Sequence, residues 1–155
     1  MAKISEKAFI AEGAVIKGDV EIADHVAVLY NSVIRGEQPV VIGRRVSLGH
    51  GVIVHGAKIG NNVLVGMGST VMDGAEIGDN CLIAAGSLIT KGKKFPPNSL
   101  IMGSPAVVKR ELTPKELESV SFNADLYLAT AIKHREGLWD TPMDDIIAEV
   151  QKGRR

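Results

Sequence analysis

The sequence predicts an all-β solenoid, a parallel β-helix built from six-residue repeats, followed by C-terminal α-helices. Three observations predict this fold class. An aliphatic residue recurs every six positions along residues 10–107. A small or β-branched residue follows most of these aliphatic positions four residues later. After residue 107 this period ends and helix-start signals follow. A long six-residue period is typical of a parallel β-helix, in which three hexapeptides make one triangular coil.

Composition and charge exclude several classes of protein. The 18 basic and 18 acidic side chains balance, so no long-range field attracts nucleic acid or an anionic membrane. No apolar run approaches the roughly 20 residues that cross a bilayer. The N-terminal stretch MAKISEKAF lacks the apolar run of a signal peptide, and the single cysteine cannot form an internal disulfide. We therefore expect a cytoplasmic protein with no nucleic-acid and no membrane partner.

The aliphatic positions that we call anchors are regular except at two places. Eight residues separate Ile34 from Ile42, so a small loop is expected to bulge from a corner there. One residue is missing between Val54 and Ile59, directly after His55. Loops of repeat proteins tend to carry function, so these irregularities mark the region of interest. The anchors are Ile10, Ile16, Ile22, Val28, Ile34, Ile42, Leu48, Val54, Ile59, Val65, Val71, Ile77, Ile83, Ile89, Phe95, Ile101 and Val107.

The residues four positions after the anchors are predicted to point inward as well. They are small or β-branched, as the narrow interior of such a coil requires. Cys81 occupies one of these positions. We therefore expect it to be a buried packing residue, since small thiols are often buried, and not a nucleophile.

Two helices are predicted after the repeats. Thr113, Pro114 and Glu116 form a capping box with proline at the first helical position, and Gly137 closes the helix. Thr141, Pro142 and Asp144 are expected to start a second, short helix that ends at Gly153. The predicted organisation is a β-helix over residues 1–110 and a helical extension over residues 111–155, packed on the prism. The apolar stripe of the first helix consists of Leu117, Val120, Ala124, Leu128 and Ala131.

The candidate functional residues begin with two histidines in the stretch LGHGVIVHG, His50 and His55. Because three hexapeptides return the chain to the same face, residues three anchors apart stack in columns. Arg35 therefore stacks under His55, whereas His50 belongs to a different column. Two histidines in different columns are poorly placed to bind one ion within a chain. Three prisms related by threefold symmetry would instead bring His50 of one chain toward His55 of the next. The alternative is that both histidines form only hydrogen bonds at such an interface.

The sequence resembles the γ-class carbonic anhydrases along nearly its whole length. The segments that carry the resemblance are SVIRGE, VSLGHGVIVHGAKIGNNVLVGMGSTVMDGAEIGDNCLIAAGSLI and PPNSLIMGSPAVVKRELTPKEL. The resemblance implies a left-handed β-helix and a homotrimer in which three histidines bind zinc at each subunit interface. In that family two of the three histidines come from one subunit and the third from its neighbour. His50 matches the histidine that comes from the neighbouring subunit, and His55 matches one of the two that come from the same subunit. Arg35 matches the arginine of the family RGD motif, Glu37 replaces its aspartate, and Tyr127 matches a tyrosine of the C-terminal helix.

The sequence also departs from that family by one coil. The family has a further coil between its RGD and GHG segments, which carries the first zinc histidine; here RGEQPVVIGRRVSLGHG joins the two directly. Arg35 then takes the place under His55, and a guanidinium cannot ligate a metal. The expected ligands are His50 and His55, with Glu37 as a third ligand or proton acceptor.

Three functions remain open from the sequence. The first is a γ-carbonic anhydrase-like metalloprotein with zinc or another divalent transition metal, acting on CO2 and bicarbonate. Arg35, Glu37 and Tyr127 would then surround the reacting atoms. The second is an acyltransferase or thioesterase that uses acyl-CoA, with His50 or His55 as a metal-free general base. The third is a non-catalytic homotrimer in which Arg35 turns the former site into an anion-binding or structural interface.

Overall fold

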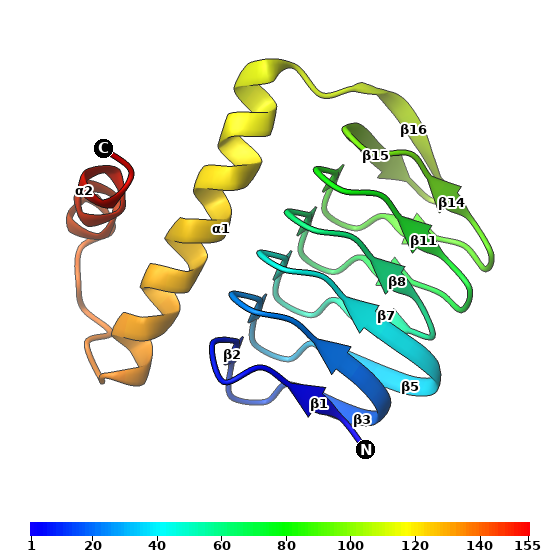
Figure 1. Cartoon of the computed structure of the whole chain (residues 1–155), viewed down its shortest axis with the longest axis horizontal. Coiled ribbons are helices and arrows are strands. Elements are labelled where there is room, and N and C mark those ends of the chain that lie inside the picture. The colour runs from blue at the N-terminus through cyan, green and yellow to red at the C-terminus, as the bar shows by residue number, and fades with distance from the viewer.

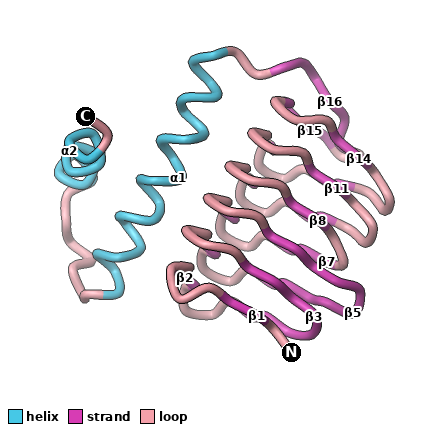
Figure 2. The backbone as a smooth tube through the Cα atoms, in the orientation of Figure 1, coloured by secondary structure: helices cyan, strands magenta, loops and turns pink.

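The computed structural model describes residues 1–155 and has the form of a stacked prism with two helices beside it (Figure 1). The prism consists of strands joined by turns, and from Ser47 to Phe95 each strand is only two or three residues long, so most of each coil there is turn and not strand (Figure 2). Strands that are one coil apart in the sequence pair in parallel. The parallel β-helix predicted from the six-residue period is therefore confirmed.

The coils give the prism three faces. The first face contains the beginnings of β3 (Val15–Ile22) and β5 (Val33–Ile42), then β7 (Ile53–His55), β10 (Thr70–Val71) and β13 (Leu88–Ile89). The second contains β1 (Lys3–Ile4), the ends of β3 and β5, β8 (Lys58–Ile59), β11 (Glu76–Ile77) and β14 (Lys94–Phe95). The third contains β2 (Phe9–Ile10), β4 (Ala27–Val28), β6 (Ser47–Leu48), β9 (Leu64–Val65), β12 (Leu82–Ile83) and β15 (Ser99–Gly103).

The anchors fill the interior of the prism. The successive anchors Ile42, Leu48 and Val54, one from each face, are fully buried. Alternate residues of a strand point to opposite sides, so the residue before each anchor faces outward. Val107 is an exception to the predicted pattern because it is 46% exposed. It lies in β16 (Ala106–Glu111), which pairs antiparallel with β15 and so leaves the parallel repeat.

The eight-residue spacing after Ile34 is accommodated inside a strand and not by a loop. Strand β5 continues through the corner, and its register against β3 shifts between Gly18 and Val20. The added residues of β5 therefore form a β-bulge around Glu37. A bulge changes the direction in which a side chain points, and such features occur next to functional sites.

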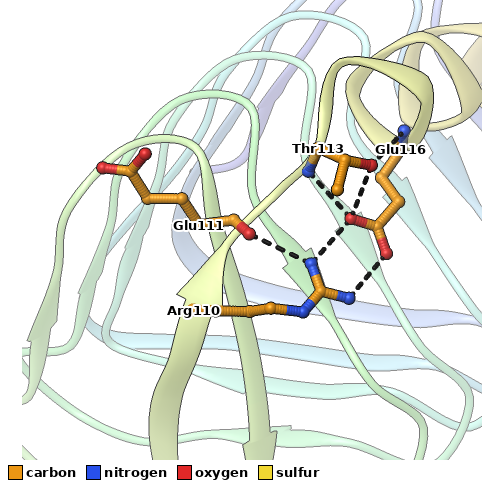
Figure 3. A network of polar contacts seen from close by, with 4 residues as sticks. All are labelled: Arg110, Glu111, Thr113 and Glu116. Carbon is orange, nitrogen blue, oxygen red and sulfur yellow. Dashed lines mark hydrogen bonds and ion pairs between the residues drawn. The ribbon is translucent and has the colours of Figure 1, made fainter.

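Helix α1 (Pro114–Arg135) begins at the capping box that the sequence predicts. The Glu116 amide donates to Thr113 Oγ1, and the Thr113 amide donates to Glu116 Oε2 at 2.8 Å. Arg110 holds the same carboxylate with two nitrogens, each 2.8 Å from an oxygen (Figure 3). The helix then runs along the prism and contacts β2, β4, β6 and β9 of the third face (Figure 1). Its most buried residues are Val120, Ala124 and Ala131.

Helix α2 (Met143–Gly153) packs against α1 on the side away from the prism (Figure 1). It ends at Gly153 as expected, but Thr141 does not cap its start. The Thr141 hydroxyl donates instead to the Leu138 carbonyl at 2.9 Å, so this side chain closes the preceding turn. Neither helix is long and apolar enough to cross a membrane.

Candidate interfacial metal site

Arg35 lies directly below His55 in the stack. The register pairs Lys17 with Arg35 and Arg35 with His55 on adjacent strands of the first face. This is the column that the repeat spacing predicts. The position under His55 is therefore occupied by a permanent cation and not by a further imidazole.

Glu37 connects Arg35 to His55. Residues two apart in a strand point to the same side, so Arg35 and Glu37 both project outward from β5. Arg35 Nη2 donates to Glu37 Oε1. The other carboxylate oxygen, Oε2, is 2.9 Å from His55 Nε2. The guanidinium thus orients Glu37 so that one oxygen faces the imidazole.

Asp73 holds the opposite side of the same imidazole. Its Oδ1 atom is 2.7 Å from His55 Nδ1, and its side chain is only 27% exposed. The sequence-based prediction did not include Asp73, although column counting contains a signal for it. Val71 pairs with Val54, so Asp73 belongs directly above Gly56, beside His55. His55 therefore lies between two carboxylates.

His50 lies elsewhere, at the junction of the third face with the first. Its ring stacks on Tyr30, with ring centroids 5.7 Å apart and planes inclined by 22°. Tyr30 is the column neighbour below His50 that the spacing predicts. His50 is exposed and makes no hydrogen bond or ion pair through its side chain. Its two ring nitrogens are thus free for another partner.

Tyr127 is close to His50 and not to the Arg35, Glu37 and His55 group. Both residues line a cavity of 310 Å³ between the third face, α1, and the start of α2.

Tyr30 also contacts helix α1. Its Oη atom is 3.1 Å from His134 Nδ1, and the His134 ring stacks on Trp139 with ring centroids 4.4 Å apart. Burial raises the pKa of the Tyr30 hydroxyl above its usual value. His134 is half-buried, and through these contacts it helps to dock α1.

A single chain does not gather a complete metal site. No three side chains among its histidines, cysteines, aspartates and glutamates are placed to hold one ion. The side chains of His55 and Glu37 provide a nitrogen and an oxygen 2.9 Å apart, both of which are normal zinc donors. The free imidazole of His50 lies at the other edge of the first face. The donor chemistry fits a divalent ion if a neighbouring chain supplies the remaining ligand.

Cys81 is a packing residue, as the sequence predicts. Its side chain is fully buried, and Sγ lies 3.3 Å from the Pro96 carbonyl. Burial raises the pKa of the Cys81 thiol, which disfavours the reactive thiolate.

Comparisons with known proteins agree with this fold. The family model described as bacterial transferase hexapeptide (six repeats) matches residues 56–91. A Methanocaldococcus jannaschii protein named "Probable carbonic anhydrase" is 47% identical over 148 positions, which cover 81% of this chain and 93% of the relative. The chain belongs to the γ-class carbonic anhydrase-like family of hexapeptide-repeat proteins. A further family relative, the "Carbonic anhydrase" of Geobacillus kaustophilus, is 41% identical and covers 76% of this chain and 78% of that protein.

Solved structures give the same fold. A hexapeptide transferase family protein from Anaplasma phagocytophilum superposes with a TM-score of 0.70 and 33% sequence identity. The match covers 84% of this chain and 91% of that one. The γ-carbonic anhydrase-like family therefore shares its architecture with proteins described as transferases.

The alignments also support a shortened chain within the γ-carbonic anhydrase-like family. The Methanocaldococcus alignment extends over 148 positions but takes in only 81% of the 155 residues of this chain. On the order of 20 positions of the relative therefore have no counterpart here, which is about the length of one coil of three hexapeptides. The Geobacillus alignment, with 141 positions and 76% of this chain, has a gap of similar size.

Proposed function

We propose that this chain forms a homotrimer that binds zinc, or another divalent transition metal, between subunits and catalyses the reversible hydration of CO2 to bicarbonate. The observation that carries the proposal is the placement of the donors on one prism face. His55, with Glu37 at 2.9 Å, lies at one edge of the first face, and the unpartnered His50 lies at the other edge. In a ring of three subunits each edge meets the opposite edge of the next chain. The relatives named carbonic anhydrase support the same activity.

The outward side chains of the first face support such an assembly. The column Val15, Val33, Ile53, Thr70 and Leu88 runs up this face and carries no charge. Ile53 is 40% exposed in the single chain. The corresponding column of the second face contains mostly charged residues: Lys3, Glu21, Val41, Lys58, Glu76 and Lys94. An uncharged column between His50 and the His55–Glu37 pair is typical of a subunit interface.

Each residue of the site then has a role that its contacts suggest. A divalent ion held by imidazole and carboxylate ligands lowers the pKa of water to about 7, so that hydroxide is available to attack CO2. Glu37 is either the third ligand or the group that accepts a proton. Arg35 keeps the Glu37 carboxylate aimed at His55. Tyr127 borders the cavity next to His50 and would shape access to the site from the neighbouring subunit.

Metal content and oligomeric state test this proposal most directly. Protein purified without chelators and without a metal-affinity step should contain about one transition-metal ion per chain, measured by elemental analysis, and sediment as a trimer. H50N and H55N should each lose the metal and the CO2 hydration rate measured by stopped flow. H25N is the matched control, because His25 has φ +58° in a turn, which asparagine tolerates. A metal-free trimer would overturn the metal site and favour a non-catalytic interface.

The second candidate function is acyl transfer or thioester hydrolysis with acyl-CoA as substrate. The observation that favours it is the contact of Asp73 with His55 Nδ1, because an aspartate that orients an imidazole makes the other nitrogen a general base. The likeness to a hexapeptide transferase family structure points the same way. A rise in melting temperature with CoA or acetyl-CoA, in metal-free protein, would support this function. No change with either compound would exclude it.

A further inference from the structure

We infer that Asp73 is a positioning residue that fixes the His55 imidazole, so that its Nε2 atom faces Glu37 and the subunit interface. This inference rests on the proposed function, in which His55 Nε2 binds the metal. Neither the sequence pattern nor the relatives assign a role to Asp73. Three features of the molecule support this role: the 2.7 Å contact with His55, the glycine below Asp73, and the lack of any other side-chain partner for the Asp73 carboxylate.

Gly56 makes the contact between Asp73 and His55 possible. Asp73 belongs to the coil above, and Gly56 lies directly beneath it, at the place where the six-residue period loses one residue. A Cβ atom on Gly56 would lie only 2.3 Å from Asp73 Oδ1. The missing side chain therefore leaves the space into which the Asp73 carboxylate enters to reach His55 Nδ1. Gly56 also has φ +53°, a left-handed conformation that favours glycine.

The two carboxylates around His55 differ in how firmly they are held. The Asp73 side chain is 27% exposed and has no side-chain partner except His55. The Glu37 side chain is 48% exposed and is shared with Arg35. An ionised carboxylate only accepts hydrogen bonds, so the shorter contact, with Asp73, favours a proton on Nδ1, whereas Glu37 favours one on Nε2. A metal ion between Nε2 and Glu37 would take the place of the Nε2 proton, and Asp73 would then hold Nδ1–H.

This arrangement corresponds to a carboxylate that supports a metal-binding histidine through its second nitrogen. Removal of such a carboxylate typically lowers metal affinity 10- to 100-fold. We therefore expect D73N and D73A to bind zinc 10- to 100-fold more weakly than the wild type, measured by competition with a chromogenic chelator. With cobalt in place of zinc, the visible spectrum of D73A should also change, because the imidazole is no longer held in one orientation.

Asp79 provides a matched control for these variants. Its Oδ1 atom also lies above a glycine, because a Cβ on Gly60 would be 2.5 Å away, and it accepts a hydrogen bond from the Asn61 amide at 2.7 Å. No histidine is among the partners of Asp79. D79N should therefore leave zinc affinity unchanged. Equal losses in D73N and D79N would show a general structural effect and would overturn the positioning role.

A measurement without metal separates the failure of this inference from the failure of the proposed function. In metal-free protein at alkaline pH, ¹⁵N NMR of the histidines, with His55 assigned from H55N, should show Nδ1–H in the wild type. D73A should instead show Nε2–H, because Glu37 Oε2 is then the only carboxylate oxygen beside the ring. An unchanged tautomer in D73A would overturn the positioning role of Asp73. A changed tautomer in a protein that binds no zinc would leave the positioning role intact and contradict only the proposed metal site.

Discussion

Glu37 divides its two carboxylate oxygens between a cation and an imidazole. Oε1 contacts Arg35, and Oε2 contacts His55 Nε2 at 2.9 Å. The Arg35 and Glu37 side chains are 50% and 48% exposed, so their ion pair contributes little to stability because water screens it. The value of this pair is geometric: it determines which oxygen is presented to His55.

The R35H variant tests whether Arg35 stands where a third histidine ligand is missing. The register places residue 35 directly below His55, so an imidazole there would join His55 and release Glu37 from its ion pair. We expect R35H to bind zinc at least about tenfold more tightly than the wild type, measured by chelator competition. R35Q is the control, because it removes the charge without adding a ligand. If R35H binds zinc no better than R35Q, residue 35 does not stand where a third ligand is missing.

Much of the candidate site follows from counting residues, and the remainder does not. The columns Arg35–His55 and Tyr30–His50 follow from the anchors, because residues at the same place after anchors three apart stack on one another even where the spacing is irregular. Asp73 was missed because its side chain bends into the space above Gly56, and column counting gives positions but not side-chain directions. The neighbourhood of Tyr127 likewise depends on the docking of α1, which no repeat encodes.

The junction between β16 and α1 contains a connected polar network. Arg110, Thr113 and Glu116 form one network in which the Glu116 carboxylate accepts hydrogen bonds from the arginine and from the helix cap (Figure 3). These contacts, with the Arg110 hydrogen bonds first among them, lower the pKa of Glu116 to about 2. The network determines the point at which the chain leaves the prism and the direction in which α1 starts.

The E116Q variant should change how stability depends on pH. The pKa of Glu116 is lowered from 4.5 to about 2 on folding, so its carboxylate stabilises the folded chain fully above pH 4.5. That contribution is lost as the pH falls toward 2. The difference in melting temperature between wild type and E116Q should therefore be constant near neutral pH and shrink steadily below about pH 5.

Glu118 provides the control for this pH experiment. It lies on the same helix but takes no part in this network, so E118Q should keep the network and the fall in melting temperature below about pH 5 that the wild type shows. A wild-type minus E116Q difference that stays constant down to pH 2 would contradict the role given to this network.

The first-face column that contains Ile53 is uncharged, whereas the second-face column that contains Val41 is mostly charged. This asymmetry predicts how the molecule assembles. I53E should dissociate the proposed trimer, because it places a carboxylate in the uncharged column of the first face. V41E is a closely matched control: Val41 is 37% exposed and Ile53 is 40% exposed, but Val41 lies on the charged second face. Sedimentation velocity should show monomers for I53E and trimers for V41E. Trimers in both variants would exclude the first face as the interface.

For the molecule as a whole, the fold could be predicted from the sequence, and the repeat pattern failed only at single places. The six-residue period specifies strand, turn and interior together, so one pattern predicts most of residues 10–101. It fails at Val107 because β16 reverses direction, and the chain pairs there without continuing the coil. The expected corner loop after Ile34 is instead a bulge in β5, since a strand can absorb added residues when its neighbour shifts register.

The parallel stack of coils also determines how the ligands of such a site can be lost or regained. Each coil holds its neighbours only through the strands above and below, so an entire coil can be removed without turning any remaining side chain inward or outward. A ligand can then be lost by subtraction of a length of chain, with every other residue of the site unaltered. Insertion of the corresponding coil of a longer relative after Glu37 would reverse that change, and the chain on either side would keep its direction. The ligand set of this protein can thus be changed by inserting or removing a coil as well as by substituting single residues.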